Sequence, residues 1–208
     1  RSTPPTTLFP YTTLFRSDYT SNSGTLTFAP GETTKTITVL VKGDVLDEAN
    51  ETYVINLSNA ANATISDAQG LGTITDDDGA GTMSIDDITV TEGDSGTVNA
   101  VFTVTLSAAS GQTVTVDFAT ADGTALQPGD YTSNSGTLTF APGETTKTIT
   151  VLVKGDVLDE ANETYLINLS NSTNATISDA QGLGTITDDS AAAPTSELQT
   201  TVSNADAG

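Results

Sequence analysis

The chain contains neither cysteine nor histidine among its 208 residues. It therefore has no disulfide, no thiolate or imidazole metal ligand, and no catalytic pair in which histidine activates serine or cysteine. The carboxylates are also bunched too closely for a two-carboxylate glycosidase. We expect no enzyme activity and no catalytic residue.

Positive charge is scarce as well, with 6 Lys and Arg against 27 Asp and Glu and a net charge of −21. Proteins bind phosphate backbones through Lys and Arg, so nucleic acid is excluded as a partner. Internal salt bridges cannot neutralise most of the carboxylates, and cations are the natural partners. No apolar run approaches the ~20 residues of a membrane-spanning helix.

Thr, Val, Ile and Gly are abundant, a composition typical of short strands and turns. The chain also repeats itself, because residues 18–77 recur as residues 130–189. Only Val54, Ala60 and Ala61 differ between the copies. A full repeat has the length of one β-sandwich, and the first copy contains only the second half of it.

This repeat predicts the domain organisation. Residues 1–17 resemble the conceptual translation of a sequencing adapter, and we expect them to be a disordered artefact. Residues 18–78 are the C-terminal half of a first repeat, 79–82 a linker and 83–190 a complete domain. Residues 191–208 are rich in Ala, Ser and Thr and are expected to be a linker or disordered tail.

Apolar and polar residues alternate with period two along seven short runs separated by turn residues. The runs are residues 83–91, 97–106, 113–120, 136–140, 146–153, 163–169 and 183–187. This pattern predicts an all-β fold in which two sheets pack as a sandwich.

Acidic residues follow alternate strands of this predicted sandwich. If successive strands run up and down, these acids meet at one end of the domain. They are Glu92, Asp94, Asp122, Asp130, Asp156, Asp159, Glu160, Glu163, Asp188 and Asp189. Two like charges about 4 Å apart repel by roughly 4 kcal/mol. Either the acids form a solvated cap that keeps the protein soluble, or they hold calcium, which takes six to eight oxygen ligands.

Several ordered motifs resemble those of the Calx-beta repeat. They are Phe118-Ala-Thr-Ala-Asp-Gly-Thr-Ala125, Gly129-Asp-Tyr131, Gly136-Thr-Leu-Thr-Phe-Ala-Pro-Gly-Glu144, Asn162-Glu-Thr-Tyr165 and Gly184-Thr-Ile-Thr-Asp-Asp189. The resemblance implies an immunoglobulin-like sandwich of seven strands, here one complete domain preceded by a truncated copy. It also implies that Ca²⁺ is the cofactor.

The resemblance further implies which carboxylates bind the metal. In the complete repeat these are Glu92, Asp122, Asp156, either Asp159 or Glu160, Glu163, Asp188 and Asp189. Gly155 stands where the modules of sodium/calcium exchangers carry another acid. The first copy retains an incomplete set from which we expect weaker binding, namely Asp44, Asp47, Glu48, Glu51, Asp76, Asp77 and Asp78.

Three functions are compatible with these features. The first is a calcium-binding repeat of a larger cell-surface or secreted protein, stiffened by metal and serving adhesion and cell communication. Its partners would be calcium ions, neighbouring repeats and a cell-surface or matrix protein or glycan, in an extracellular location with the parent protein membrane-anchored. The alternatives are a calcium-sensing regulatory domain of a membrane transporter and a metal-free spacer attached to an enzyme.

Overall fold

A computed structural model describes residues 18–190 of the chain. The segments 1–17 and 191–208, predicted to be disordered, lie outside the described residues. Residues 18–190 form fourteen strands. Within this range there is no helix long and apolar enough to cross a membrane.

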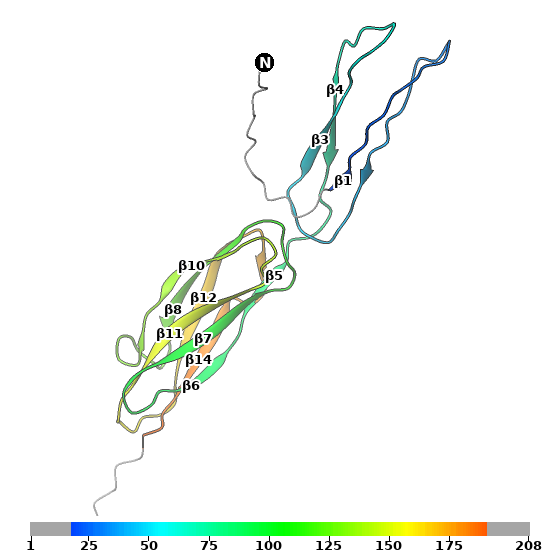
Figure 1. Cartoon of the computed structure of the whole chain (residues 1–208). Coiled ribbons are helices and arrows are strands. Elements are labelled where there is room, and N and C mark those ends of the chain that lie inside the picture. Colours follow the sequence, from blue (N-terminus) through cyan, green and yellow to red (C-terminus); the bar gives the residue numbers. More distant parts are fainter. Residues whose placement is uncertain (1–17, 191–208) are drawn as a thin grey trace, which may run out of the picture.

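The complete repeat is a sandwich of two five-stranded sheets (Figure 1). One sheet has the order β10-β8-β12-β14-β6 and the other β13-β5-β7-β11-β9. The strands are β5 (Thr82–Ile85), β6 (Ile88–Thr91), β7 (Gly96–Leu106), β8 (Val114–Asp122), β9 (Tyr131–Thr132), β10 (Ser135–Phe140), β11 (Thr146–Gly155), β12 (Glu163–Thr173), β13 (Thr176–Ile177) and β14 (Gln181–Thr187). The predicted all-β, immunoglobulin-like sandwich is confirmed.

The core lies between the sheets and is built by the alternation read in the sequence. On β7, every second residue from Ala100 to Leu106 is buried. Aromatic rings fill the centre, where Tyr165 stacks on Tyr131 with ring centroids 4.6 Å apart and meets the edge of Phe102 at 6.0 Å. Burying a large apolar side chain stabilises a fold by roughly 1.5–3 kcal/mol, so this layer fixes how the strand ends are arranged.

The structure corrects the prediction of a single strand over residues 83–91. The run divides into β5 and β6, which belong to different sheets. Asp86 ends the first part, because its side chain accepts a hydrogen bond from the amide of Thr103 at 2.6 Å. Asp87 begins the second, accepting one from the amide of Leu183 on β14 at 2.7 Å. The chain thus crosses from one sheet to the other at these two adjacent aspartates.

The truncated first repeat forms two separate two-stranded sheets that extend from the sandwich as open hairpins (Figure 1). β1 (Tyr19–Thr20) pairs with β2 (Leu40–Val41), and β3 (Glu51–Asn56) pairs with β4 (Gln69–Ile74). Residues 18–78 contain no counterpart of β5 to β8, and the inner faces of these hairpins are therefore open.

Strand pairing brings several strand ends to one end of the sandwich. β6 runs parallel to β14, so that Thr91 lies beside Thr187 with their hydroxyl oxygens 2.9 Å apart. Gly96 pairs with Gly155, and Asp122 pairs with Tyr165. The residues that follow β6, β8 and β14 and the loop between β11 and β12 consequently meet there. We call this the acidic end.

Candidate metal centre

Three carboxylates at the acidic end lie close enough to share one ion. Asp130, Glu160 and Glu163 each offer an oxygen, and these oxygens lie within 4.8 Å of one another. Asp130 directly precedes β9, Glu163 begins β12, and Glu160 lies in the loop before it. Two oxygens that both bind calcium at 2.3–2.6 Å can be at most about 5 Å apart, so the spacing fits this ion.

Glu92 lies deeper, with only 5% of its surface exposed. Burial raises its pKa to about 7, and the charges of Asp156, Asp188 and Glu160 add to the shift. A hydrogen bond between Glu92 and Asp188 raises it further. Glu92 is thus a buried acid facing other acids, which an incoming cation would stabilise in its charged form.

Glu163 is perturbed in the same way. Burial is again the largest cause of a pKa raised to about 7, followed by a hydrogen bond to Asp130 and the charges of Asp130, Glu160 and Glu92. The pKa of Glu160, which is itself exposed, is raised as well, by partial desolvation and by the charges of Asp156, Asp130 and Asp188. Side chains from four separate segments therefore repel one another at this end.

No lysine or arginine relieves this repulsion in the described part of the complete repeat. Lys147 pairs with Glu144 at 2.7 Å, in the turn between β10 and β11 at the opposite end. The ammonium group of Lys154 donates a hydrogen bond to the backbone carbonyl of Pro128. The donor set is all oxygen and carries a large excess of negative charge, which suits a hard divalent cation such as calcium.

Other predicted ligands have structural roles in this arrangement. Asp122 accepts a 2.6 Å hydrogen bond from the hydroxyl of Tyr131 and a 3.2 Å bond from the amide of Gln127. These two hydrogen bonds hold the loop after β8 against the end of that strand. Asp122 is not one of the three clustered carboxylates. Asp189 accepts a 3.0 Å bond from the amide of Gly93.

Asp156 and Asp188 are close to the cluster and also shape its loops. Asp156 accepts a 2.7 Å hydrogen bond from the amide of Leu158. Asp188 accepts one at 3.2 Å from the amide of Glu160 and one at 3.1 Å from that of Ser190. Of the alternatives left open by the sequence, Glu160 is in the cluster. Asp159 is not one of the clustered carboxylates, although both residues are exposed.

Asp130 is the one clustered residue missing from the ligands implied by resemblance. The sequence does place it at the correct end, since it follows the strand that closes with Asp122. What it does not reveal is that the loop from Asp122 to Tyr131 folds back. The amides of Leu126 and Gln127 bond to Asp130 and Asp122, at 2.6 Å and 3.2 Å, and return Asp130 to the cluster.

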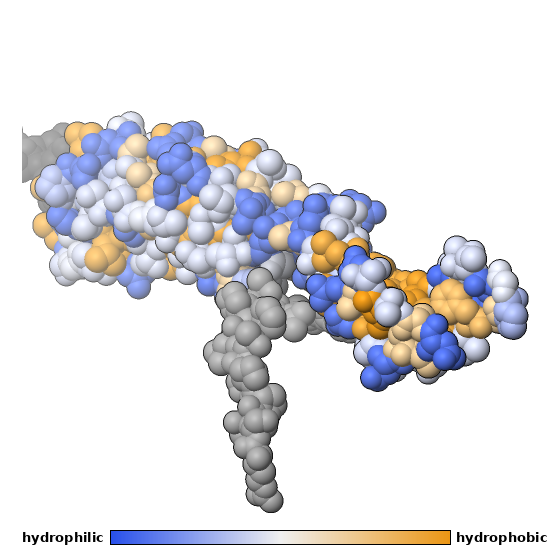
Figure 2. All heavy atoms as spheres, turned by 90° about the horizontal axis from the view of Figure 1, so that it is seen from above, coloured by the Kyte–Doolittle hydropathy of each residue, from blue (hydrophilic) through white to orange (hydrophobic). Residues whose placement is uncertain are grey.

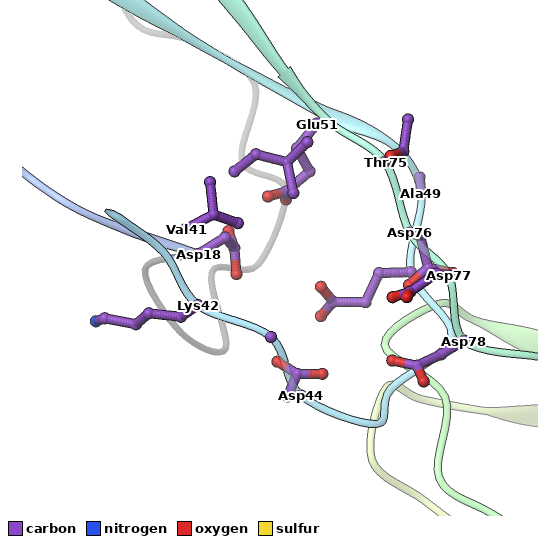
Figure 3. A pocket seen from close by; sticks show the side chains of 13 residues that line it. Asp18, Val41, Lys42, Asp44, Ala49, Glu51, Thr75, Asp76, Asp77 and Asp78 are labelled. Carbon is purple, nitrogen blue, oxygen red and sulfur yellow. The ribbon is translucent and has the colours of Figure 1, made fainter. Parts of the chain in front are cut away.

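The first repeat carries the same three residue types, because Asp18, Glu48 and Glu51 occupy the positions of Asp130, Glu160 and Glu163 in the sequence copy. Among the described residues, however, the 4.8 Å grouping of carboxylate oxygens is found in the second repeat alone. Figure 3 shows Asp18 and Glu51 turned toward each other in a pocket that Asp44 and Asp76 to Asp78 also line. A hydrogen bond to Asp18 is the largest cause of the raised pKa of Glu51, about 7. The pKa values of Glu48 and Asp78 are raised too, chiefly by burial.

Asp47, also a predicted ligand in this repeat, contacts the second repeat. Its backbone carbonyl accepts hydrogen bonds from the amide of Gly111 at 3.1 Å and the hydroxyl of Ser110 at 3.2 Å. Its carboxylate lies 3.4 Å from the side-chain nitrogen of Gln112. The acidic loop of one repeat thus rests on the non-acidic end of the next.

The sequence matches the Calx-beta domain family twice, over residues 15–78 and 75–193. The chain belongs to the Calx-beta domain family. Calcium, predicted as the cofactor from the sequence, agrees with this membership and with the oxygen cluster.

Curated relatives include sodium/calcium exchanger 2 of Rattus norvegicus, 34% identical over 175 residues that cover 74% of this chain and 18% of the relative. Sodium/calcium exchanger 1 of Canis lupus familiaris is 49% identical over 59 residues, which cover 28% of this chain and 6% of the relative. The Calx-beta chain therefore spans less than a fifth of the length of these relatives.

Two solved structures have a related shape. The calcium binding domain CBD12 of CALX1.1 superposes with a TM-score of 0.48 and 24% identity, covering 53% of this chain and 47% of that one. The apo-form Calx CBD1 domain gives 0.46 and 23%, covering 52% and 97%.

Proposed function

We propose that this chain is a calcium-binding module in which the acidic end of each Calx-beta repeat holds divalent ions. The observation that carries the proposal is the cluster of Asp130, Glu160 and Glu163, whose oxygens lie within 4.8 Å of one another. When bound, the ion supplies positive charge that these side chains lack. The charges of Asp156 and Asp188 act on both Glu92 and Glu160, and we expect Glu92, Asp156 and Asp188 to add oxygen ligands to the cluster.

Binding at the first repeat acts on its neighbour. Asp44, Glu48 and Glu51 line the pocket of the first repeat, and Asp47 within the same loop contacts Ser110 to Gln112 of the second. An ion that orders this loop therefore stiffens the joint between repeats. Neighbouring repeats and calcium ions are the partners that this function requires.

Similarity to sodium/calcium exchangers supports the regulatory alternative, in which the module reports calcium to a transporter. Adhesion, cell communication and an extracellular location at a cell surface remain predictions from the repeated sequence alone. The exchanger relatives lend them no support, and we therefore restrict the proposed function to calcium binding within a tandem. No catalytic role is assigned.

Thermal unfolding tests the proposal directly. A ligand that binds only the native state stabilises it by RT ln(1 + [L]/Kd), about 2.7 kcal/mol at a hundredfold excess over Kd. We expect millimolar calcium to raise Tm by several degrees, and chelator to reverse the shift. Magnesium should do less because it prefers fewer protein ligands and more water. An unchanged Tm in calcium would leave the chain as a metal-free spacer.

A further inference from the structure

The acidic loops of the two repeats have the same sequence but differ in exposure. Residues 46–48 of the first repeat are half-buried, whereas their copy, residues 158–160, is exposed. The described first repeat has fewer strands than the second, so the additional cover does not come from its own residues. It comes from the second repeat, on which the loop rests.

The second repeat contacts this loop through the turn between β7 and β8. The amide of Gly111 donates a 3.1 Å hydrogen bond to the carbonyl of Asp47. A Cβ at Gly111 would lie 2.7 Å from Cγ and 2.8 Å from Oε1 of Glu48, so the Glu48 side chain lies directly against this glycine. The turn is itself held in place, because the carbonyl of Ser110 accepts a 2.9 Å hydrogen bond from the amide of Gly143.

Glu48 is also the residue by which the two carboxylate clusters differ. In the second repeat the three carboxylates are grouped within 4.8 Å, whereas the described residues of the first repeat form no such group. Two of its members, Asp18 and Glu51, are hydrogen-bonded to each other, as their copies are. The remaining member is Glu48, the one that lies against Gly111.

We propose that Glu48 has two alternative positions, one against Gly111 in the metal-free chain and one with Asp18 and Glu51 when an ion is bound. The second repeat thereby regulates ion binding by the first. This inference rests on the proposed calcium binding. Glu48 is near enough for the change, because its charge contributes to the raised pKa of Glu51 and that of Asp18 to its own. The hydrogen bond to Gly111 uses the backbone of Asp47 and leaves the Glu48 side chain free to turn.

The direction of the regulation follows from the competition for one side chain. An ion that draws Glu48 into the cluster removes its contact with Gly111. Coupling between two binding events is reciprocal, so the same contact weakens ion binding by the first repeat. Hydrophilic side chains gather where the first repeat meets the sandwich (Figure 2), and the contact can open without exposing an apolar surface there.

Gly111→Ala tests this direction on the full chain. The added methyl group takes the space of the Glu48 side chain, which is flexible, and Gly111 is not among the glycines with a positive φ. We expect Glu48 to be released and the calcium affinity of the first repeat to rise at least threefold. Calcium titration of the ¹⁵N-labelled chain measures this, because the amide signals of residues 43–51 and 155–163 report the two repeats separately. The affinity of the second repeat should not change.

A matched glycine supplies the control. Gly24→Ala makes the same chemical change in the first repeat, but nothing lies within 4 Å of the added Cβ. We expect parental affinity at both repeats. In the parent chain, the amide signals of residues 110–112 should shift with the dissociation constant of the first repeat, although these residues lie at the non-acidic end of their own repeat.

Glu48→Gln shows whether the effect acts through this side chain. The amide is a poorer ligand, and we expect it to lower the affinity of the first repeat and to abolish the gain from Gly111→Ala in the double variant. A gain that persists in the double variant would overturn the proposal.

The outcomes also separate this inference from the proposed function. If both repeats bind calcium but Gly111→Ala leaves the affinity of the first unchanged or lowers it, the inference is wrong and the proposed function stands. The same holds if calcium binds the second repeat alone. Absence of binding at both repeats would overturn the two together.

Discussion

Glu163 is hydrogen-bonded to Asp130, a contact between two carboxyl groups that requires one of them to hold a proton. In the absence of metal, that proton is held until the pH approaches the raised pKa of Glu163, about 7. Calcium and protons therefore compete for the same oxygens. This competition gives the acidic end a distinctive dependence on pH.

In chelator, we expect the free energy of unfolding to fall as pH rises from about 5 to about 7.5. Unfolded glutamates lose their protons near pH 4.5, whereas folded Glu92 and Glu163 keep theirs to about 7. The folded state binds more protons in this window, so the stabilisation present at low pH is lost as pH rises through 7. Because Glu163 is partly exposed, we expect a loss of about 1–2 kcal/mol rather than the full shift.

Denaturant unfolding at a series of pH values measures this slope. With saturating calcium the slope should flatten or reverse, because deprotonated ligands bind metal more tightly. Stability that is constant or increasing across the window in chelator would contradict the crowding of these acids.

Glu163→Gln should separate metal binding from folding. The amide removes a repelling charge, so we expect the metal-free protein to be as stable as the parent or up to about 1 kcal/mol more stable at pH 7.5. The same change removes a ligand and should weaken the calcium-induced rise in Tm at least several-fold. Glu144→Gln is the matched control at the opposite end, where Glu144 pairs with Lys147. A parental calcium response in Glu163→Gln would show that the site lies elsewhere.

The sequence predicted the sandwich because alternation of apolar residues is a local signal, as along β7 and β11. It also predicted which end carries the acids, since strand direction follows from chain order. Asp86 and Asp87 split a predicted strand through hydrogen bonds to Thr103 and Leu183, and those partners become neighbours only after folding. The recruitment of Asp130 depends in the same way on contacts between distant residues.

Two tyrosines that stack in the core should respond in opposite ways to loss of their hydroxyl groups. Tyr131→Phe removes the 2.6 Å hydrogen bond to Asp122 and leaves a charged acceptor short of a donor. We expect it to cost about 1.5–3 kcal/mol. The buried hydroxyl of Tyr165 has no hydrogen-bond partner among the described residues. Tyr165→Phe should therefore be neutral or stabilising by up to about 1 kcal/mol.

Denaturant unfolding of the two variants side by side tests this pair, because both changes delete one oxygen from the same aromatic stack. If Tyr165→Phe were the more destabilising change, its hydroxyl would have to be bonded, and the packing described for the core would be wrong.

Close packing around Gly155 predicts that no side chain can be added at this position next to the metal site. A Cβ at this position would lie 2.0 Å from the backbone oxygen of Gly93 and 2.6 Å from that of Glu92. An aspartate at this position therefore cannot be accommodated unless the turn after β6 moves away. Gly155→Asp should destabilise the metal-free protein by about 1–3 kcal/mol, the usual cost of overpacking.

The same substitution adds a carboxylate next to the cluster yet should weaken calcium binding, because it displaces Glu92. Calcium titration followed by calorimetry measures this effect, with Gly155→Ala separating the steric part from the charge. Both variants should lose affinity. Tighter calcium binding by Gly155→Asp than by the parent would mean that the backbone around Glu92 is free to rearrange. The close packing of Gly155 on Gly93 would then not determine the position of the ligands at the acidic end.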